Sequence, residues 1–342
     1  MLPEKRDTGT ARCRSSSVPR HRYQGIYLCF FSETIVRRHL VLASFLFVSL
    51  PAMALTFQTR LEQAEWKVDG DQFECRLSQP VTGFGSGEFV RRAGEAAIFR
   101  LSANERWMGK GAAVLLAAAA PWQPGRGDIS LGVVSVAEGD KPFSSTHEQA
   151  GRLLTGLLEG RSPLVRHRTL SGNESLEVRL LPTRFRTAYD DYLGCTAKLL
   201  PVNFDQIQRS QLGFPGAGTD LDELAKAKLD IILEFIKADP SVNHIELDGH
   251  SDNSGNRLTN RELSRRRALA VQEYLVGRGV PVDSIVVRFH GERYPLVPNS
   301  SATNRAKNRR VMISLSREPV ADHAQAEAMN PPAVGSEKPA GG

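Results

Sequence analysis

The pattern of hydrophobic and polar positions divides the chain after residue 54 into two parts that meet near residue 200. In the first part, short apolar or alternating runs are separated by turn formers such as Asp69-Gly70-Asp71, as in antiparallel hairpins. These runs predict strands over 64–68, 73–77, 87–90, 96–101, 112–119, 129–136, 164–170 and 176–181. The stretch 145–158 instead has leucines at helical spacing and predicts a helix that ends at Gly160. We therefore expect a mainly antiparallel β domain with at least one helix over residues 55–200.

The second part alternates strands with helices. Its apolar runs predict strands over 202–207, 245–247, 285–289 and 311–315, with helices over 220–237 and 260–276. Thr219 and Asp222 fit a capping box at the start of the first of these helices. We expect an α/β sandwich over 201–316, with one sheet and helices against one face, so the fold class is α+β. Residues 317–342 have no periodicity and predict a disordered tail.

The N-terminal segment has the pattern of a signal peptide. Arg37-Arg38 precede an apolar run of 11 residues, and Ala52-Met53-Ala54 follow, which predicts a signal peptide over 37–54 with cleavage between Ala54 and Leu55. An uncleaved anchor is the alternative, although the run is shorter than the roughly 20 residues of a membrane span. Residues 1–36 are too long for an n-region, and we interpret them as an over-extended start. Because Leu55 is not a cysteine, we expect a periplasmic protein without a lipid anchor or a membrane span after cleavage.

The net charge of +6 changes little in this picture. Residues 1–54 contain eight basic and three acidic residues, which leaves 36 basic against 35 acidic residues in the remainder. The segment 257–310 is locally basic, with twelve basic and four acidic residues, whereas 205–252 is acidic. Since the periplasm holds little nucleic acid, we expect no nucleic-acid partner, and we expect the basic residues to face an anionic cell-wall polymer or solvent.

The cysteines agree with this compartment. Cys13 and Cys29 precede the predicted cleavage site, so Cys75 and Cys195 are the only pair in the mature chain. In an oxidising periplasm we expect them to form a disulfide, with two buried free thiols as the alternative. Closing a loop of about 120 residues would stabilise the fold by about 4–5 kcal/mol in the chain-entropy model.

Other functional classes fit the sequence poorly. Gly249-His250-Ser251 is similar to the start of a hydrolase nucleophile elbow, but Asn253 stands where that motif requires glycine, so we expect no enzyme. His250 and Asp252 have no further ligands near them in sequence, so we expect no metal and no cofactor. The uniformly small run 112–120 lacks the alternation of a membrane barrel.

Two groups of motifs resemble known families. Gly249–Gly255, Asn260–Ala268, Tyr274-Leu275, Gly291-Glu292 and Asn304–Val311 resemble the OmpA-like peptidoglycan-binding domain over most of 201–315. Tyr189–Cys195 leading into 199–204 resembles the MotY family of the bacterial flagellar motor. The second resemblance implies that residues 55–200 bind flagellar basal-body and stator proteins, while the wall domain anchors the assembly. A periplasmic or outer-membrane-associated wall-binding protein without a motor role is the alternative.

The expected ligand chemistry concerns diaminopimelate of the peptidoglycan stem peptide, which presents an ammonium and a carboxylate on one carbon. Binding both groups requires an anion beside a bidentate cation, and Asp with Arg fits this need. Asp252 follows a predicted strand, and the next helix offers Arg265, Arg266 or Arg267, each able to point back towards that loop. The resemblance selects Asp252 and Arg267. An Asp–Arg ion pair without a ligand is the alternative.

The matching motifs also imply peptidoglycan contacts for Ser251, Asn260, Asn304 and Arg309. Asn260 would either orient the loop or cap the helix. Asn304 and Arg309 would either contact the ligand or serve packing, as would Asn308. We expect Arg310 to be solvated.

Overall fold

The computed structural model describes residues 54–120, 123, 125–169, 174–216 and 218–317. The predicted start segment, the signal peptide up to Met53 and the tail after Arg317 lie outside the described residues. Within the described ranges, no helix is both long enough and apolar enough to cross a membrane.

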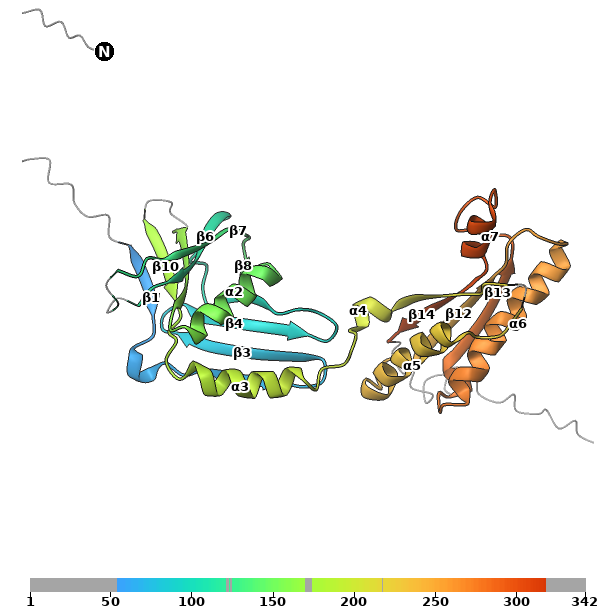
Figure 1. The fold of residues 1–342 in the computed structure, drawn as a ribbon, viewed down its shortest axis with the longest axis horizontal. Coiled ribbons are helices and arrows are strands. Elements are labelled where there is room, and N and C mark those ends of the chain that lie inside the picture. The colour runs from blue at the N-terminus through green and yellow to red at the C-terminus, as the bar shows by residue number, and fades with distance from the viewer. Residues whose placement is uncertain (1–53, 121–122, 124, 170–173, 217, 318–342) are drawn as a thin grey trace, which may run out of the picture. The chain divides into compact units, whose positions relative to one another are not determined.

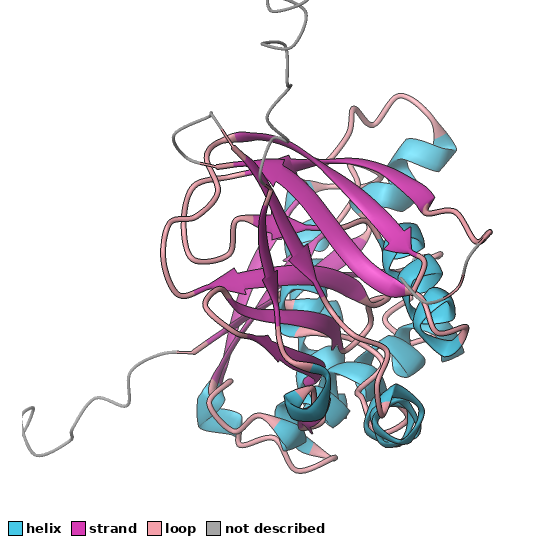
Figure 2. Cartoon of the chain, turned by 90° about the vertical axis from the view of Figure 1, so that its left-hand side faces the viewer, coloured by secondary structure: helices cyan, strands magenta, loops and turns pink. Residues whose placement is uncertain are grey.

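The first part forms a ten-stranded sheet, in which only the pairing of β1 with β10 is parallel (Figure 1). The strand order is β1-β10-β9-β6-β7-β8-β5-β4-β3-β2. The strands are β1 (Leu55–Gln58), β2 (Lys67–Gly70), β3 (Glu74–Val81), β4 (Gly85–Arg92), β5 (Ile98–Ala103), β6 (Gly111–Ala118), β7 (Ile129–Val136), β8 (Phe143–Ser144), β9 (Ser162–Arg168) and β10 (Ser175–Arg179). Figure 2 shows how strongly these strands twist. The expected mainly antiparallel β architecture is confirmed.

Helices α2 (His147–Leu158) and α3 (Phe185–Thr196) pack against this sheet. Inward-facing residues alternate along β3 and β5, and they build a core rich in aromatic side chains. Phe84, Phe89, Phe99, Phe143 and Phe185 are all buried in it. Helix α2 is the predicted one, and Thr146 and Gln149 form its capping box. Helix α3 was not evident in the sequence because it buries few positions and has no side-chain cap at its start.

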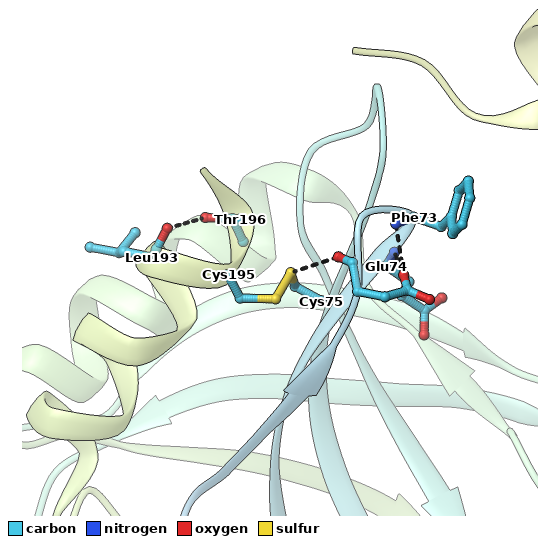
Figure 3. Close-up of a disulfide and its surroundings, with 7 residues drawn as sticks. Phe73, Glu74, Cys75, Leu193, Cys195 and Thr196 are labelled. Atoms are coloured by element: carbon cyan, nitrogen blue, oxygen red, sulfur yellow. Dashed lines mark hydrogen bonds between the residues drawn. A yellow bond between two sulfur atoms is a disulfide. The ribbon is translucent and has the colours of Figure 1, made fainter. Parts of the chain in front are cut away.

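A disulfide joins this sheet to helix α3. Cys75 on β3 is bonded to Cys195 near the end of α3, with 6.1 Å between their Cα atoms (Figure 3). The bond closes a segment with a sequence separation of 120. The predicted disulfide is thus confirmed.

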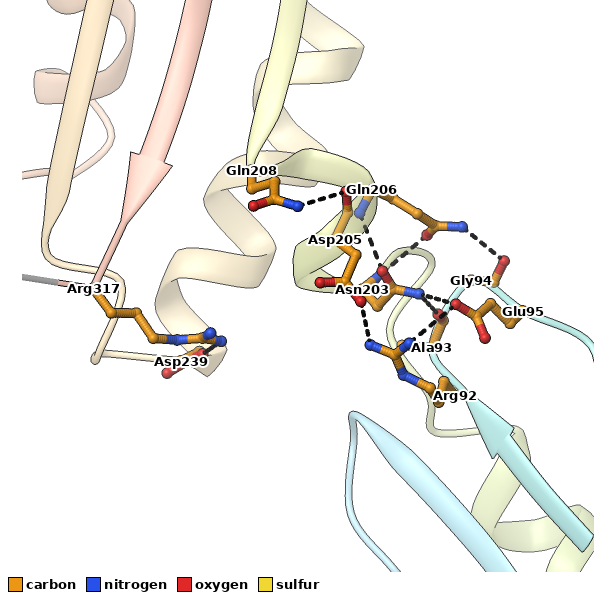
Figure 4. A network of polar contacts seen from close by, with 10 residues as sticks. All are labelled: Arg92, Ala93, Gly94, Glu95, Asn203, Asp205, Gln206, Gln208, Asp239 and Arg317. Carbon is orange, nitrogen blue, oxygen red and sulfur yellow. Dashed lines mark hydrogen bonds and ion pairs between the residues drawn. The ribbon is translucent and has the colours of Figure 1, made fainter. Parts of the chain in front are cut away.

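The expected strand over 202–207 is wrong. Phe204–Ile207 form the one-turn helix α4, because Asn203 and Gln206 make a reciprocal capping box that favours helical backbone. The buried Asn203 amide also donates to the Ala93 carbonyl at 3.0 Å (Figure 4). These bonds fix the start of α4 against the turn that follows β4.

The second part is a four-stranded sheet in the order β11-β14-β12-β13, in which only β12 and β13 run parallel. Its strands are β11 (Arg209–Gly213), β12 (His244–His250), β13 (Ile285–Gly291) and β14 (Arg310–Ser316). Its helices are α5 (Glu223–Ala238), α6 (Arg257–Val276) and the short α7 (Ala302–Asn308). Apolar residues of α5 and α6 share one core with the sheet, as expected for helices against one face.

Both long helices begin at a cap that differs from the expectation. Asp222 caps α5 by accepting the Ala225 N–H at 2.8 Å, so the predicted capping box beginning at Thr219 is wrong. Asn256 caps α6 by accepting the Thr259 N–H at 2.8 Å. The helix therefore starts one turn earlier than predicted, and Asn260 lies inside it rather than at its cap.

Candidate functional site

A close contact between β12 and α6 positions the candidate site. Gly249 lies directly against the Ser264 carbonyl, so a Cβ at this position would collide with the helix backbone. The Ser264 hydroxyl also accepts the Gly291 N–H at 3.0 Å, which ties α6 to the end of β13. The helix is therefore held against the strand ends, and Arg267, one turn further along, is directed inward.

Arg267 is the largest fully buried side chain among the described residues. Its Nε donates to the Gly218 carbonyl at 3.0 Å, and its Nη2 donates to the Gly216 carbonyl at 2.8 Å. The guanidinium carbon lies 5.1 Å from the centre of the Phe214 ring. Nη1 is buried and has no hydrogen-bond partner among the described residues. Burial, followed by the nearby Arg309 charge, lowers the pKa of Arg267 to about 10, so the group remains charged at neutral pH.

Asp252 is the buried anion of the site. One carboxylate oxygen, Oδ2, accepts from Arg309 Nη1 at 2.8 Å, and Oδ1 accepts the Ser254 N–H at 2.9 Å. Burial opposes ionisation of this carboxyl, but the bonds from Arg309 and Ser254 outweigh it and lower the pKa of Asp252. The carboxylate is thus ionised at neutral pH, and its direct ion-pair partner is Arg309.

The backbone carbonyls of Phe214, Pro215, Gly216 and Gly218 accept from the two arginines. Arg309 donates to the Phe214 carbonyl at 3.1 Å and to the Pro215 carbonyl at 2.7 Å, while Arg267 holds the glycine carbonyls further along. Sequence reasoning missed this loop as part of the site. Its hydrogen bonds to the arginines come from backbone carbonyls, which leave no side-chain pattern to read.

The charges of Arg267 and Asp252 determine which kind of ligand the site can bind. Among the described residues, no carboxylate forms an ion pair with Arg267, although Asp252 lies close enough to affect its pKa. A buried guanidinium with an unused N–H favours an incoming carboxylate, and the nearby Asp252 carboxylate favours a cation. The site can therefore receive a ligand that presents both charges.

Ser251 and Asn260 support the same loop. Ser251 is buried, its N–H donates to the Gly291 carbonyl at 2.9 Å, and its hydroxyl has no partner. The buried Asn260 amide donates to the Glu292 carboxylate. Of the two roles considered for Asn260, loop orientation is consistent with this contact, whereas the capping role belongs to Asn256.

The structure places Asn304 apart from the Asp252–Arg267 pair. It lies on α7, where its backbone N–H bonds to Ser301 and its side chain to Ser300. The neighbouring Asn308 is fully buried and serves packing, because its carbonyl oxygen accepts the N–H groups of Leu296 and Val297. Of the residues in this last motif, Arg309 alone contacts Asp252.

The expectation that Arg310 is solvated is wrong. Its residue is only 6% exposed, and its guanidinium donates to the carbonyls of Asn308 and Tyr294 at 3.3 and 3.2 Å. Arg310 is the first residue of β14 and pairs with His250 on β12. This position places the side chain beneath the loop that follows β13. Burial lowers the pKa of Arg310.

In the ranges that the structure describes, no group of three or more His, Cys, Asp or Glu side chains is arranged to hold a metal ion. The Ser251 hydroxyl has no histidine as a hydrogen-bond partner there.

Comparison with known families covers both parts of the chain. Residues 57–201 match the MotY N-terminal domain, and residues 214–309 match the OmpA family. Over 277 residues the chain is 27% identical to the sodium-type flagellar protein MotY of Vibrio parahaemolyticus. The aligned region covers 80% of this chain and 94% of that protein.

Two further similarities each cover part of the chain. The peptidoglycan-associated lipoprotein of Pseudomonas putida is 37% identical over 95 residues, which are 28% of this chain and 56% of that protein. Among solved structures, the C-terminal domain of Helicobacter pylori MotB is 26% identical, with 35% of this chain and 93% of that chain covered and a TM-score of 0.30. The two family matches fall on the two parts of the chain, so the first part is similar to the MotY N-terminal domain and the second part to the OmpA family.

Proposed function

We propose that this protein is a non-enzymatic component of the bacterial envelope that binds peptidoglycan through residues 201–316. Its ligand is diaminopimelate of the stem peptide, with Asp252 and Arg267 as the main contacts. Residues 55–200 link the flagellar basal body with stator complexes and so support motility. The observation that carries the proposal is the fully buried Arg267, which keeps an unpartnered N–H next to the Asp252 loop in an OmpA-family domain.

The ligand assignment follows from the charges of the site. The carboxylate of the diaminopimelate centre would accept from Arg267, whose buried Nη1 lacks an acceptor. The ammonium would bind Asp252, whose carboxylate is ionised and has Arg309 on one side only. Ser251 contributes a second unpartnered polar atom beside the same loop. A zwitterion therefore satisfies groups that the free protein leaves unsatisfied.

The motor role is supported by the first part of the chain. Residues 57–201 match the MotY N-terminal domain, and the similarity to the Vibrio flagellar protein extends over both parts. The similarity to a peptidoglycan-associated lipoprotein supports the second candidate, an envelope protein without a motor role. Deleting the gene distinguishes them: the motor role requires loss of swimming with normal filaments, whereas an envelope defect with normal swimming supports the second candidate.

Sedimentation with purified peptidoglycan tests the wall site. Asp252→Ala and Arg267→Ala should each weaken binding by about 2–5 kcal/mol, because each leaves a desolvated charge of the complex unpaired. Arg267→Lys keeps the charge but loses the planar fork, so it should also be defective.

Arg265→Ala is the matched control. Arg265 lies on the same helix, is exposed and pairs with Glu262, so its loss should leave binding close to wild type. The assignment fails if the Asp252 and Arg267 variants, shown by circular dichroism to be folded, pellet as well as the wild-type protein.

A further inference from the structure

The basic segment 257–310 sorts into residues with partners and residues without them. Most of its arginines bond to a carboxylate or a backbone carbonyl of the described chain: Arg265 and Arg266 to Glu262, Arg278 to Asp230, Arg288 to Glu246, Arg309 to Asp252, and Arg267, Arg305 and Arg310 to carbonyls. Arg257, Arg261 and Arg293 have no such partner there, and Lys307 is exposed on α7. Arg257, Arg261 and Arg293 are therefore the arginines of this segment whose charge has no carboxylate or carbonyl partner among the described residues.

These three arginines line the same cavity. It has a volume of about 690 Å³ and lies between the first turns of α6 and the segment that follows β13. Leu258, Phe289, His290 and Glu292 complete its lining. The Arg261 guanidinium lies 5.2 Å from the centre of the Phe289 ring, so the cavity combines positive charge with an apolar surface. Its one carboxylate, from Glu292, already accepts from Asn260.

The cavity adjoins the Asp252 loop through direct contacts. Ser251, next to Asp252, donates its N–H to the Gly291 carbonyl. The Asn260 side chain lies beside Gly255 of the Asp252 loop, and its amide donates to Glu292 of the cavity wall. A ligand seated at Asp252 thus has the arginine-lined cavity as its neighbour on the same surface of the domain.

We propose that this cavity is a second anion subsite, which takes the free carboxylates of a stem peptide beside the one bound at Asp252. The inference rests on the proposed function, because it assigns a further part of the same wall polymer. Stem peptides present several carboxylates together with apolar methyl and methylene groups. The three guanidiniums complement the carboxylates, while Phe289 and the 80% exposed Leu258 offer contact for the apolar groups.

The test compares two probes on one set of variants. Intact peptidoglycan sacculi can occupy both subsites, whereas free diaminopimelate fills only the Asp252–Arg267 site. The triple variant Arg257→Gln/Arg261→Gln/Arg293→Gln should bind sacculi about tenfold more weakly at low salt and lose part of the salt dependence, because exposed cation–anion contacts are modest and screened. Its affinity for diaminopimelate, measured by calorimetry, should equal that of the wild-type protein.

The double variant Arg265→Gln/Arg266→Gln is the control, because it removes two exposed charges of the same helix that pair with Glu262. It should bind sacculi like the wild-type protein. Equal sacculus binding by the triple variant would overturn the second subsite, even if Asp252→Ala still abolishes binding to both probes.

Two further outcomes are decisive. If Asp252→Ala weakens neither probe, the proposed function itself fails. If the triple variant binds sacculi normally but loses binding to phosphatidylglycerol vesicles, the cavity serves a lipid phosphate and the wall subsite is wrong.

Discussion

The two sheets of this protein use their buried space differently. The ten-stranded sheet packs on a core rich in aromatic rings, and the Cys75–Cys195 disulfide joins its strand β3 to helix α3. The four-stranded sheet has a mainly aliphatic core that includes Phe214 and Phe235, yet the largest fully buried side chain among the described residues is the charged Arg267 on α6, which packs against this sheet. Burying a cation without a carboxylate partner destabilises a fold, whereas burying phenylalanine stabilises it. The first sheet is therefore arranged for stability, and the second retains a destabilising group that a ligand can use.

The largest expected effect concerns the first sheet. Cys75→Ser/Cys195→Ser should lower the free energy of unfolding by about 4–5 kcal/mol, because the loop of 120 residues is no longer closed in the unfolded chain. Denaturant unfolding of the two proteins measures this difference, with wild-type protein under reducing conditions as a second comparison. A loss below about 1 kcal/mol would show that the disulfide contributes little to this region.

The next prediction concerns the second sheet. Arg267→Met should abolish binding to peptidoglycan, a loss of about 2–5 kcal/mol, while changing the free energy of unfolding by less than about 2 kcal/mol. A long apolar side chain fills the same space without the desolvation of a charge. Co-sedimentation and denaturant unfolding on the same preparation measure both quantities. A large loss of stability would mean that Arg267 is mainly a structural residue, and the contrast between the two sheets would disappear.

Acidification should lower the free energy of unfolding by a smaller amount, through His250. Burial, followed by the charges of Arg310 and His290, lowers the pKa of His250 from 6.5 to about 4, although Asp248 opposes this. Between these pH values the unfolded chain binds the proton more readily than the folded one. Stability should therefore fall as the pH drops from 6.5 to 4, by up to about 3 kcal/mol. His250→Phe should flatten the unfolding free energy across this window, and an unchanged pH dependence would contradict the assignment.

The smallest predicted effect separates two asparagines of the second sheet. Asn256→Ala should lower the free energy of unfolding by about 1 kcal/mol, because α6 loses its N-cap. Asn260→Ala should instead weaken peptidoglycan binding, because α6 loses its bond to Glu292 next to the Asp252 loop. Thermal unfolding and co-sedimentation distinguish the two. If Asn256→Ala leaves the melting temperature unchanged, the helix start does not depend on this cap.

Secondary structure was predictable wherever a strong periodicity ran through a segment. Strand β7 was predicted with the bounds that the structure has, and α2 followed from its leucines. Prediction failed where a local side-chain bond overrode the pattern. Val202 and Ile207 suggested a strand, but the Asn203–Gln206 capping box made a helical turn. Helix α3 escaped because only Phe185, Ala188 and Tyr192 of it are buried.

The sequence and the family resemblance name candidate site residues, but neither gives the contacts between them. The sequence pointed to Asp252, and the resemblance to Arg267, whereas the ion pair of Asp252 with Arg309 spans 57 positions of sequence. The burial of Arg310 likewise depends on its pairing with His250 and on the carbonyl of Tyr294. Such partners come together only when β12, β14 and the loop after β13 have assembled.

The amino-acid sequence by itself determined the α+β class and the pairing of Cys75 with Cys195, because each depends on local periodicity or on a small number of choices. The tertiary structure decided which arginines are buried, paired or free. Arginines 265, 266 and 267 are consecutive and chemically identical, and only the direction of each side chain on α6 separates two exposed ion pairs from one buried cation with an unpartnered N–H among the described residues. That direction is fixed by the close approach of Gly249 to Ser264, a contact between elements that no local pattern encodes.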